Sequence, residues 1–241
     1  MEPTEQAAHE ILAMLEATYQ PTHRYVQVQA KDFAHLDLRF YDRTAKQLIG
    51  RGYRVLGDFE DKTITETPSG VLMPIMIRAL VSRDGTVMGS MYDPRIKGFG
   101  LRLLLWLFRK LPAPAIDLET ECTDGTFVVT TNAEAASAFA TPALINAEYM
   151  AKKTPLDAVE KSHMARVAAH LAQRPGVSAK VVTSHGELLA SQNRMNAIKA
   201  AHRGELGGVT REELESLAMF GRKTARDVHD AVREEQMRRA S

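Results

Sequence analysis

Two copies of one short turn constrain this chain more than any other feature. Asp84-Gly85-Thr86 and Asp124-Gly125-Thr126 each stand between runs of residues that favour β-strands. Asp-Gly is a strong local signal for a two-residue hairpin turn, because both central positions need a positive φ that these residues tolerate. The sequence therefore predicts two antiparallel hairpins, one closed by each turn.

The same turns predict which residues lie opposite one another. The first turn sets Val81 opposite Met88, in a strand pair that is apolar on both faces. Such strands are typical of the centre of a sheet that is covered on both sides. By the same rule, the second turn sets Cys122 opposite Phe127 on an inner face.

Helical patterns dominate both ends of the chain. Apolar residues recur at helical spacing over residues 5–18 and 33–49, around a short alternating run at 24–29. Residues 155–173 follow the same helical spacing. Capping boxes begin at Ser184 and Thr210, each with a glutamate three residues later.

These patterns predict an α+β fold with an antiparallel meander of about five strands, an inserted apolar helix, and flanking N-terminal and C-terminal helices. We expect an α+β domain over residues 1–140 that contains the sheet. A helical α-β-α region over 141–205 should pack on it, and a charged helical tail should occupy 206–241.

Composition excludes some functions and favours one location. With 31 basic and 30 acidic residues, the net charge of +1 gives no overall attraction for nucleic acid. The single cysteine cannot form an internal disulfide, the N-terminus lacks the pattern of a signal peptide, and no apolar run reaches the roughly 20 residues of a membrane span. We therefore expect a cytoplasmic protein.

An apolar block at 99–111 separates the two hairpins. As a helix it has a broad Leu/Phe face and an opposite stripe of Arg102, Trp106 and Arg109, followed by Lys110. These four residues are the predicted binding residues for a partner. The block is interpreted as a helix that covers the sheet; the alternative is a helix lying in an anionic membrane surface.

An acidic row follows this block. Asp117, Glu119 and Glu121 alternate along one strand, a pattern that predicts a solvated outer face. Alternatively, the row could take part in hard-cation binding, or one member could act as a general base with a histidine brought in by the fold. The histidines show no metal-ligand spacing, so no catalytic residue, metal ligand or cofactor is predicted.

The function predicted from these features is that of a non-enzymatic intracellular binding or interaction protein of unknown ligand. Its partner would be another protein or a small apolar ligand, bound on the sheet or along the 97–111 helix. Two alternatives stand beside it. One is a peripheral membrane protein that uses residues 95–111, and the other is a hydrolase that uses the acidic row.

Overall fold

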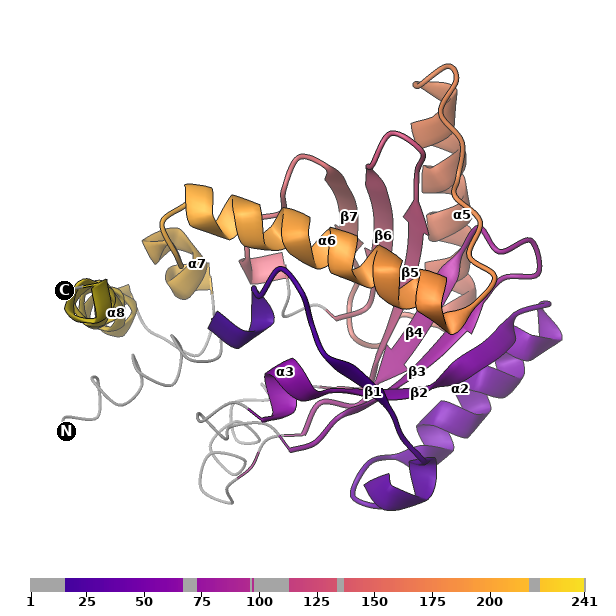
Figure 1. Cartoon of the computed structure of the whole chain (residues 1–241), viewed down its shortest axis with the longest axis horizontal. Coiled ribbons are helices and arrows are strands. Elements are labelled where there is room, and N and C mark those ends of the chain that lie inside the picture. The colour runs from indigo at the N-terminus through magenta and orange to yellow at the C-terminus, as the bar shows by residue number, and fades with distance from the viewer. Residues whose placement is uncertain are drawn as a thin grey trace.

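In the part of the chain that the structure describes, a seven-stranded mixed sheet carries helices on both faces (Figure 1). The computed structural model describes residues 16–66, 73–95, 97, 113–133, 137–216 and 222–240. Strands neighbour one another in chain order, and every pair is antiparallel except β6 and β7, which are parallel. An α+β fold with a mainly antiparallel sheet is therefore confirmed.

The strands are β1 Tyr25–Gln27, β2 Arg54–Asp61, β3 Met76–Val81, β4 Met88–Tyr92, β5 Ala115–Glu121, β6 Phe127–Thr131 and β7 Ile145–Tyr149. The helices are η1 Ala30–Phe33, α2 Leu38–Gly50, α3 Lys62–Thr65, α5 Leu156–Ala172, α6 His185–Glu205, α7 Arg211–Ser216 and α8 Arg222–Ala240. The sheet thus has seven strands where about five were expected, and β7 was not predicted. The inserted apolar helix lies outside the described residues, and the expected domain division stays a prediction.

Helix ends follow the local signals. The N–H of Tyr53 donates to the carbonyl of Leu48 at 3.1 Å, and Gly52, with φ of 93°, provides the left-handed position that ends α2. The predicted capping box of Ser184 and Glu187 is present at the start of α6. These ends are fixed by side chains close in sequence, which is why the sequence identifies them.

The first hairpin has the register that the sequence predicts, with Val81 opposite Met88. Its turn differs from a two-residue turn. The N–H of Gly85 donates to the carbonyl of Ser82 at 2.9 Å, and the N–H of Ser82 donates to the carbonyl of Val87 at 2.8 Å. The loop therefore holds four residues, with Gly85 at a φ of 78°.

The second hairpin has a loop one residue shorter, and its predicted register is wrong. The N–H of Cys122 donates to the carbonyl of Thr126 at 2.8 Å, so Glu121 lies opposite Phe127 in place of Cys122. In the first hairpin the hydroxyl of Ser82 accepts the N–H that closes the longer loop, at 2.9 Å. Cys122 stands at the equivalent position, and a thiol is only a weak acceptor.

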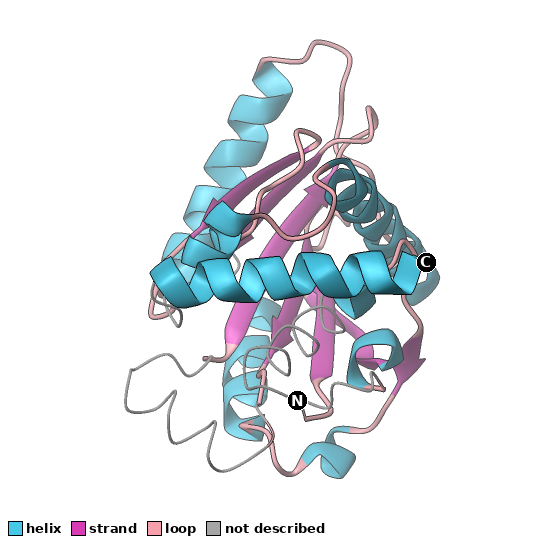
Figure 2. Cartoon of the chain, turned by 90° about the vertical axis from the view of Figure 1, so that its left-hand side faces the viewer, coloured by secondary structure: helices cyan, strands magenta, loops and turns pink. Residues whose placement is uncertain are grey.

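Helices pack on both faces of the sheet (Figure 2). α2 and α5 cover one face, in a cluster that includes Leu48, Leu80, Met91, Leu118 and Val159. α6 crosses the other face, where Met195 packs with Phe127 and Ile145, and Leu188 packs with Val81 and Met88. β3 and β4 lie at the sheet centre, as their apolar faces predict.

A buried histidine ties α5 to the sheet. His163 is fully buried, with Nε2 3.1 Å from Oγ1 of Thr120 and Nδ1 3.2 Å from Oγ1 of Thr130. Burial, together with the charge of Arg166, lowers the pKa of His163 to about 4. The ring is therefore neutral at pH 7 and supplies one donor and one acceptor.

Replacing His163 with Gln should remove a pH dependence of stability. A histidine whose pKa falls from about 6.5 in the unfolded chain to about 4 in the folded protein contributes stability above pH 6.5 that is lost as the pH falls towards 4. At pH 5 this loss is about 2 kcal/mol. Urea unfolding at pH 7 and pH 5 should show a smaller fall for His163→Gln than for the wild type. The exposed-site control, His35→Gln, should keep the full fall.

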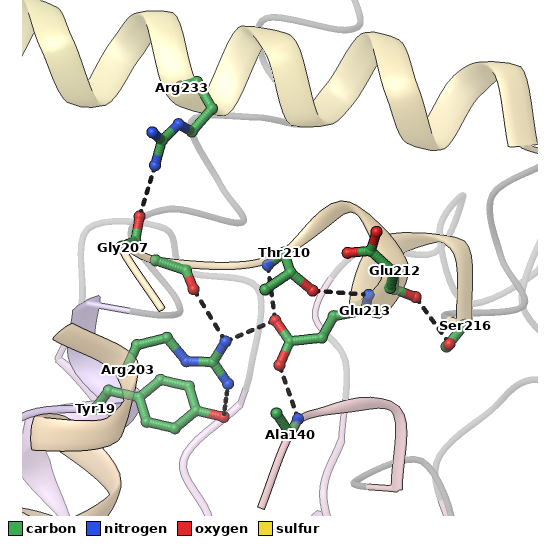
Figure 3. Close-up of polar contacts among 10 residues, drawn as sticks. Tyr19, Ala140, Arg203, Gly207, Thr210, Glu212, Glu213, Ser216 and Arg233 are labelled. Carbon is green, nitrogen blue, oxygen red and sulfur yellow. Dashed lines mark hydrogen bonds and ion pairs between the residues drawn. The ribbon is translucent and has the colours of Figure 1, made fainter. Parts of the chain in front are cut away.

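The end of α6 meets α7 at a buried ion pair (Figure 3). Arg203 donates from Nη1 to Oε2 of Glu213 at 2.6 Å and from Nη2 to the hydroxyl of Tyr19 at 3.1 Å. Glu213 also accepts the backbone N–H groups of Ala140 at 2.7 Å and Thr210 at 2.8 Å. The hydroxyl of Thr210 accepts the N–H of Glu213 at 3.2 Å, which confirms the predicted capping box.

Replacing Glu213 with Gln should lower the free energy of unfolding by about 3 kcal/mol, because it leaves the buried guanidinium of Arg203 without its carboxylate. Urea unfolding measures the loss. Glu212 is exposed on the same helix, so Glu212→Gln should change stability by less than about 0.5 kcal/mol. Equal effects of the two substitutions would contradict the importance of the ion pair.

Candidate functional site

The acidic row lies under α6, which corrects the prediction of a solvated face. β5 is an inner strand between β4 and β6, and the row points to the side that α6 crosses. Glu119 and Glu121 are only 7% and 1% exposed. Alternating carboxylates are solvated on an open hairpin, but a helix laid over the strand removes their water.

One member of the row, Glu121, is neutralised by two basic residues. Arg194 donates from Nε and Nη2 to its two carboxylate oxygens, both at 2.7 Å, and Lys180 donates at 2.5 Å. Burial opposes ionisation, but these hydrogen bonds outweigh it and hold the pKa of Glu121 below its usual value. Glu121 is therefore a structural anion that fastens α6 to β5.

The other two members, the carboxylate pair (Asp117 and Glu119), are less well compensated. Burial and the charge of Asp117 raise the pKa of Glu119 to about 7, while Lys199 and a hydrogen bond from Gln192 act in the opposite direction. Burial also raises the pKa of Asp117, which accepts hydrogen bonds from the hydroxyls of Thr131 and Tyr92. With a pKa of about 7, Glu119 is about half protonated at pH 7.

A second acidic group, the histidine pair (His23 and Asp61), lies on the same side of the sheet. Nδ1 of His23 is 2.5 Å from Oδ2 of Asp61, and the two residues are 6% and 5% exposed. α6 also reaches this pair, because the N–H of His23 donates to Oδ1 of Asn193 at 3.0 Å. A carboxylate only accepts, so Nδ1 of a neutral His23 carries the proton and Nε2 carries a lone pair. Nε2 is buried and has no hydrogen-bond partner in the part of the chain that the structure describes.

Tyr25 connects the two pairs. Its ring stacks on that of His23 with 6.0 Å between centroids, and Asn196 of α6 donates to its hydroxyl at 3.2 Å. Burial makes the largest contribution to the raised pKa of Tyr25, and the charges of Asp61 and Glu119 raise it further. The hydroxyl therefore lies within the electrostatic reach of both acidic groups.

The side chains of the two pairs can accept hydrogen bonds and can bind positively charged groups. Asp117, Glu119 and Asp61 supply carboxylates, and Lys199 is the basic residue that acts on both members of the carboxylate pair. Within the described ranges, no group of three or more His, Cys, Asp or Glu side chains is placed to hold a metal ion. The functional groups of this arrangement are carboxylates, tyrosine hydroxyls and one imidazole acceptor.

The binding residues predicted from the sequence are not among those of the arrangement described above. Arg102, Trp106, Arg109 and Lys110 lie outside the described residues, so binding by them and membrane association through 95–111 stay predictions. No helix in the described ranges is long and apolar enough to cross a bilayer. Cys122 is fully buried, and burial raises the pKa of its thiol, as expected for a core position.

Sequence reasoning missed the histidine pair entirely. His23 and Asp61 are 38 residues apart, and no spacing motif connects them. They meet because Tyr25 lies opposite Asp61 where β1 pairs with β2. To predict this contact from the sequence, the predicted strands at 24–29 and 53–59 would have to be paired in the correct register.

Comparison with known proteins adds no relative to this picture. No protein-family model, curated protein or solved structure matches the chain.

Replacing Glu119 with Gln should stabilise the protein above pH 7. A carboxyl whose pKa is about 7 in the folded protein and 4.5 in the unfolded chain costs about 3 kcal/mol of stability once both forms are ionised. The cost is absent below pH 4.5 and grows as the pH rises to 7. Urea unfolding should therefore show a gain of about 2 to 3 kcal/mol for Glu119→Gln at pH 8 and little change at pH 4.

Glu121 offers the matched control, two residues along the same strand. Glu121→Gln should lower the free energy of unfolding at pH 8 by about 1 to 2 kcal/mol, because Arg194 and Lys180 lose their partner and are themselves partly exposed. Opposite signs for the two substitutions are expected. Destabilisation by both would show that Glu119 is compensated as well as Glu121.

Proposed function

We propose that the protein is a non-enzymatic binding protein whose ligand is a small organic cation held at the carboxylate pair. The observation that supports this is the contrast along β5. Glu121 has two basic partners at hydrogen-bond distance, whereas Asp117 and Glu119 repel one another beneath α6. Lys199 acts on both carboxyl groups, and a bound cation would supply the second positive charge that the pair lacks.

The surroundings of the pair favour an organic cation. Tyr92 donates to Asp117 at 3.5 Å, and its own pKa is raised well above 10 by burial and by the charge of Asp117. Tyr149 also acts on the pKa of Tyr92. Tyrosine rings beside carboxylates attract organic ammonium groups through both ring faces and charge. This polar setting leads us to an amine in place of the apolar ligand expected from the sequence.

A hydrolase that uses the acidic row is the second candidate. It is supported by the pKa of Glu119, since about 7 is the value that suits a general acid or base. Glu121, however, is tied to Arg194 and Lys180, and the described hydrogen bonds to Asp117 and Glu119 come from hydroxyl and amide groups. We therefore favour binding without turnover, because a hydrolase would need a further catalytic group beside these hydroxyl and amide donors.

Three four-carbon probes test the proposal: n-butylammonium, butyrate and 1-butanol, each titrated at pH 7.5 by calorimetry. We expect the cation alone to bind, with Kd on the order of 1 mM, because a ligand of about five heavy atoms gains about −1 kcal/mol per atom at best. Recovery of the amine unchanged separates binding from turnover. Binding of the alcohol or the anion as tightly as the cation would contradict the proposal.

The two glutamate variants again serve as a pair. Glu119→Gln should weaken butylammonium binding by about tenfold, because it removes the charge that the ammonium meets. Glu121→Gln should leave the affinity within about a factor of two. Equal losses in both variants would place the cation elsewhere on the acidic side of the sheet.

A further inference from the structure

A buried imidazole nitrogen without a partner lies beside the proposed cation site. His23 is only 6% exposed, and its Nε2 has no hydrogen-bond partner among the described residues. Buried polar atoms in native proteins are nearly always paired, and one that is not calls for a physical explanation. The other ring nitrogen, Nδ1, is engaged by Asp61, and the backbone N–H is engaged by Asn193.

Asp61 sets the tautomer that the neutral imidazole adopts. Its Oδ2 lies 2.5 Å from Nδ1, and its Oδ1 accepts the N–H of Thr63 at 3.1 Å, so the carboxylate is held from both sides. A proton on Nδ1 leaves a lone pair on Nε2. The aspartate thus acts as a positioning residue, and the histidine presents an acceptor on the side away from it.

We propose that His23 and Asp61 form a second half-site for the same ligand, in which Nε2 accepts a hydrogen bond from a second ammonium group. The ligand would be an alkyl diamine, with one ammonium at the carboxylate pair and the other at the histidine pair. This inference rests on the proposed function, because it assumes that a cation occupies the carboxylate pair.

Tyr25 and α6 supply the continuity between the half-sites. Tyr25 stacks on His23, and its hydroxyl feels the charges of Asp61 and Glu119. α6 contacts both ends within one turn and a half, through Gln192 at Glu119 and through Asn193 and Asn196 at His23 and Tyr25. A methylene chain beside the Tyr25 ring would join two ammonium groups, one facing the carboxylate pair and the other facing Nε2 of His23.

The test compares 1,4-diaminobutane with n-butylamine, which has the same carbon chain and one ammonium. Calorimetry at pH 7.5 should give a Kd about tenfold lower for the diamine, the factor that one charge-assisted hydrogen bond supplies. In His23→Phe the diamine should lose this advantage while butylamine keeps its affinity. Retained butylamine binding also shows that the variant is folded. His35→Phe, at an exposed histidine, should keep the tenfold difference.

The outcomes separate the two proposals. If butylamine binds and the diamine binds no tighter, or if the advantage survives in His23→Phe, the half-site is refuted while the cation site stands. If neither amine binds the wild type, the cation site fails and the half-site fails with it. If a water molecule alone occupies the site at Nε2 of His23, the diamine binds no tighter than butylamine, and the half-site is refuted.

A spectrum of the wild type decides the matter if His23→Phe does not fold. Long-range proton–nitrogen correlation distinguishes an imidazole nitrogen that carries a lone pair from one that carries a proton. Titration with 1,4-diaminobutane should shift one lone-pair Nε2 signal, and butylamine should leave that signal in place. No histidine signal that moves with the diamine alone would overturn the proposal.

Discussion

The contact between α6 and the acidic side of β5 is the interaction on which most of this structure depends. Gln192 donates to Glu119, Arg194 binds Glu121 with two nitrogens, and the next residue, Met195, packs with Phe127 and Ile145. α6 thus holds the sheet through hydrogen bonds and an ion pair together with apolar contacts. Because the same contact removes water from the carboxylates, it creates the candidate site as well as the fold.

Several features of the fold are determined by short stretches of sequence, and the predictions made from these stretches are confirmed. The capping boxes at Ser184 and Thr210, the stop of α2 at Gly52 and the pairing of Val81 with Met88 depend on neighbours within a few residues. The errors come from other causes. A thiol at position 122 in place of a hydroxyl shortens the second loop by one residue, and β7 is a five-residue strand whose place is set by its partner β6.

The candidate site was even less accessible from sequence, because its members meet through long-range contacts. Glu119 meets Gln192 across 73 residues, and His23 meets Asp61 across 38. Alternation correctly placed Asp117, Glu119 and Glu121 on one side of a strand, but it cannot tell whether a helix covers that side. The meaning of the acidic row therefore changed with the docking of α6, although its residues were identified in advance.

The carboxylate pair also indicates how binding and protonation would be linked. Glu119 and Glu121 are the same residue type on the same strand. Hydrogen bonds from two basic residues outweigh burial and lower the pKa of Glu121, whereas burial beside Asp117 raises the pKa of Glu119 to about 7. Near neutral pH a proton and a cationic ligand would therefore compete for the same charge. Ligand uptake would release a proton, and mild acidification would favour the ligand-free, protonated pair. A carboxyl kept where it destabilises the empty protein is the kind of local cost that a binding function explains.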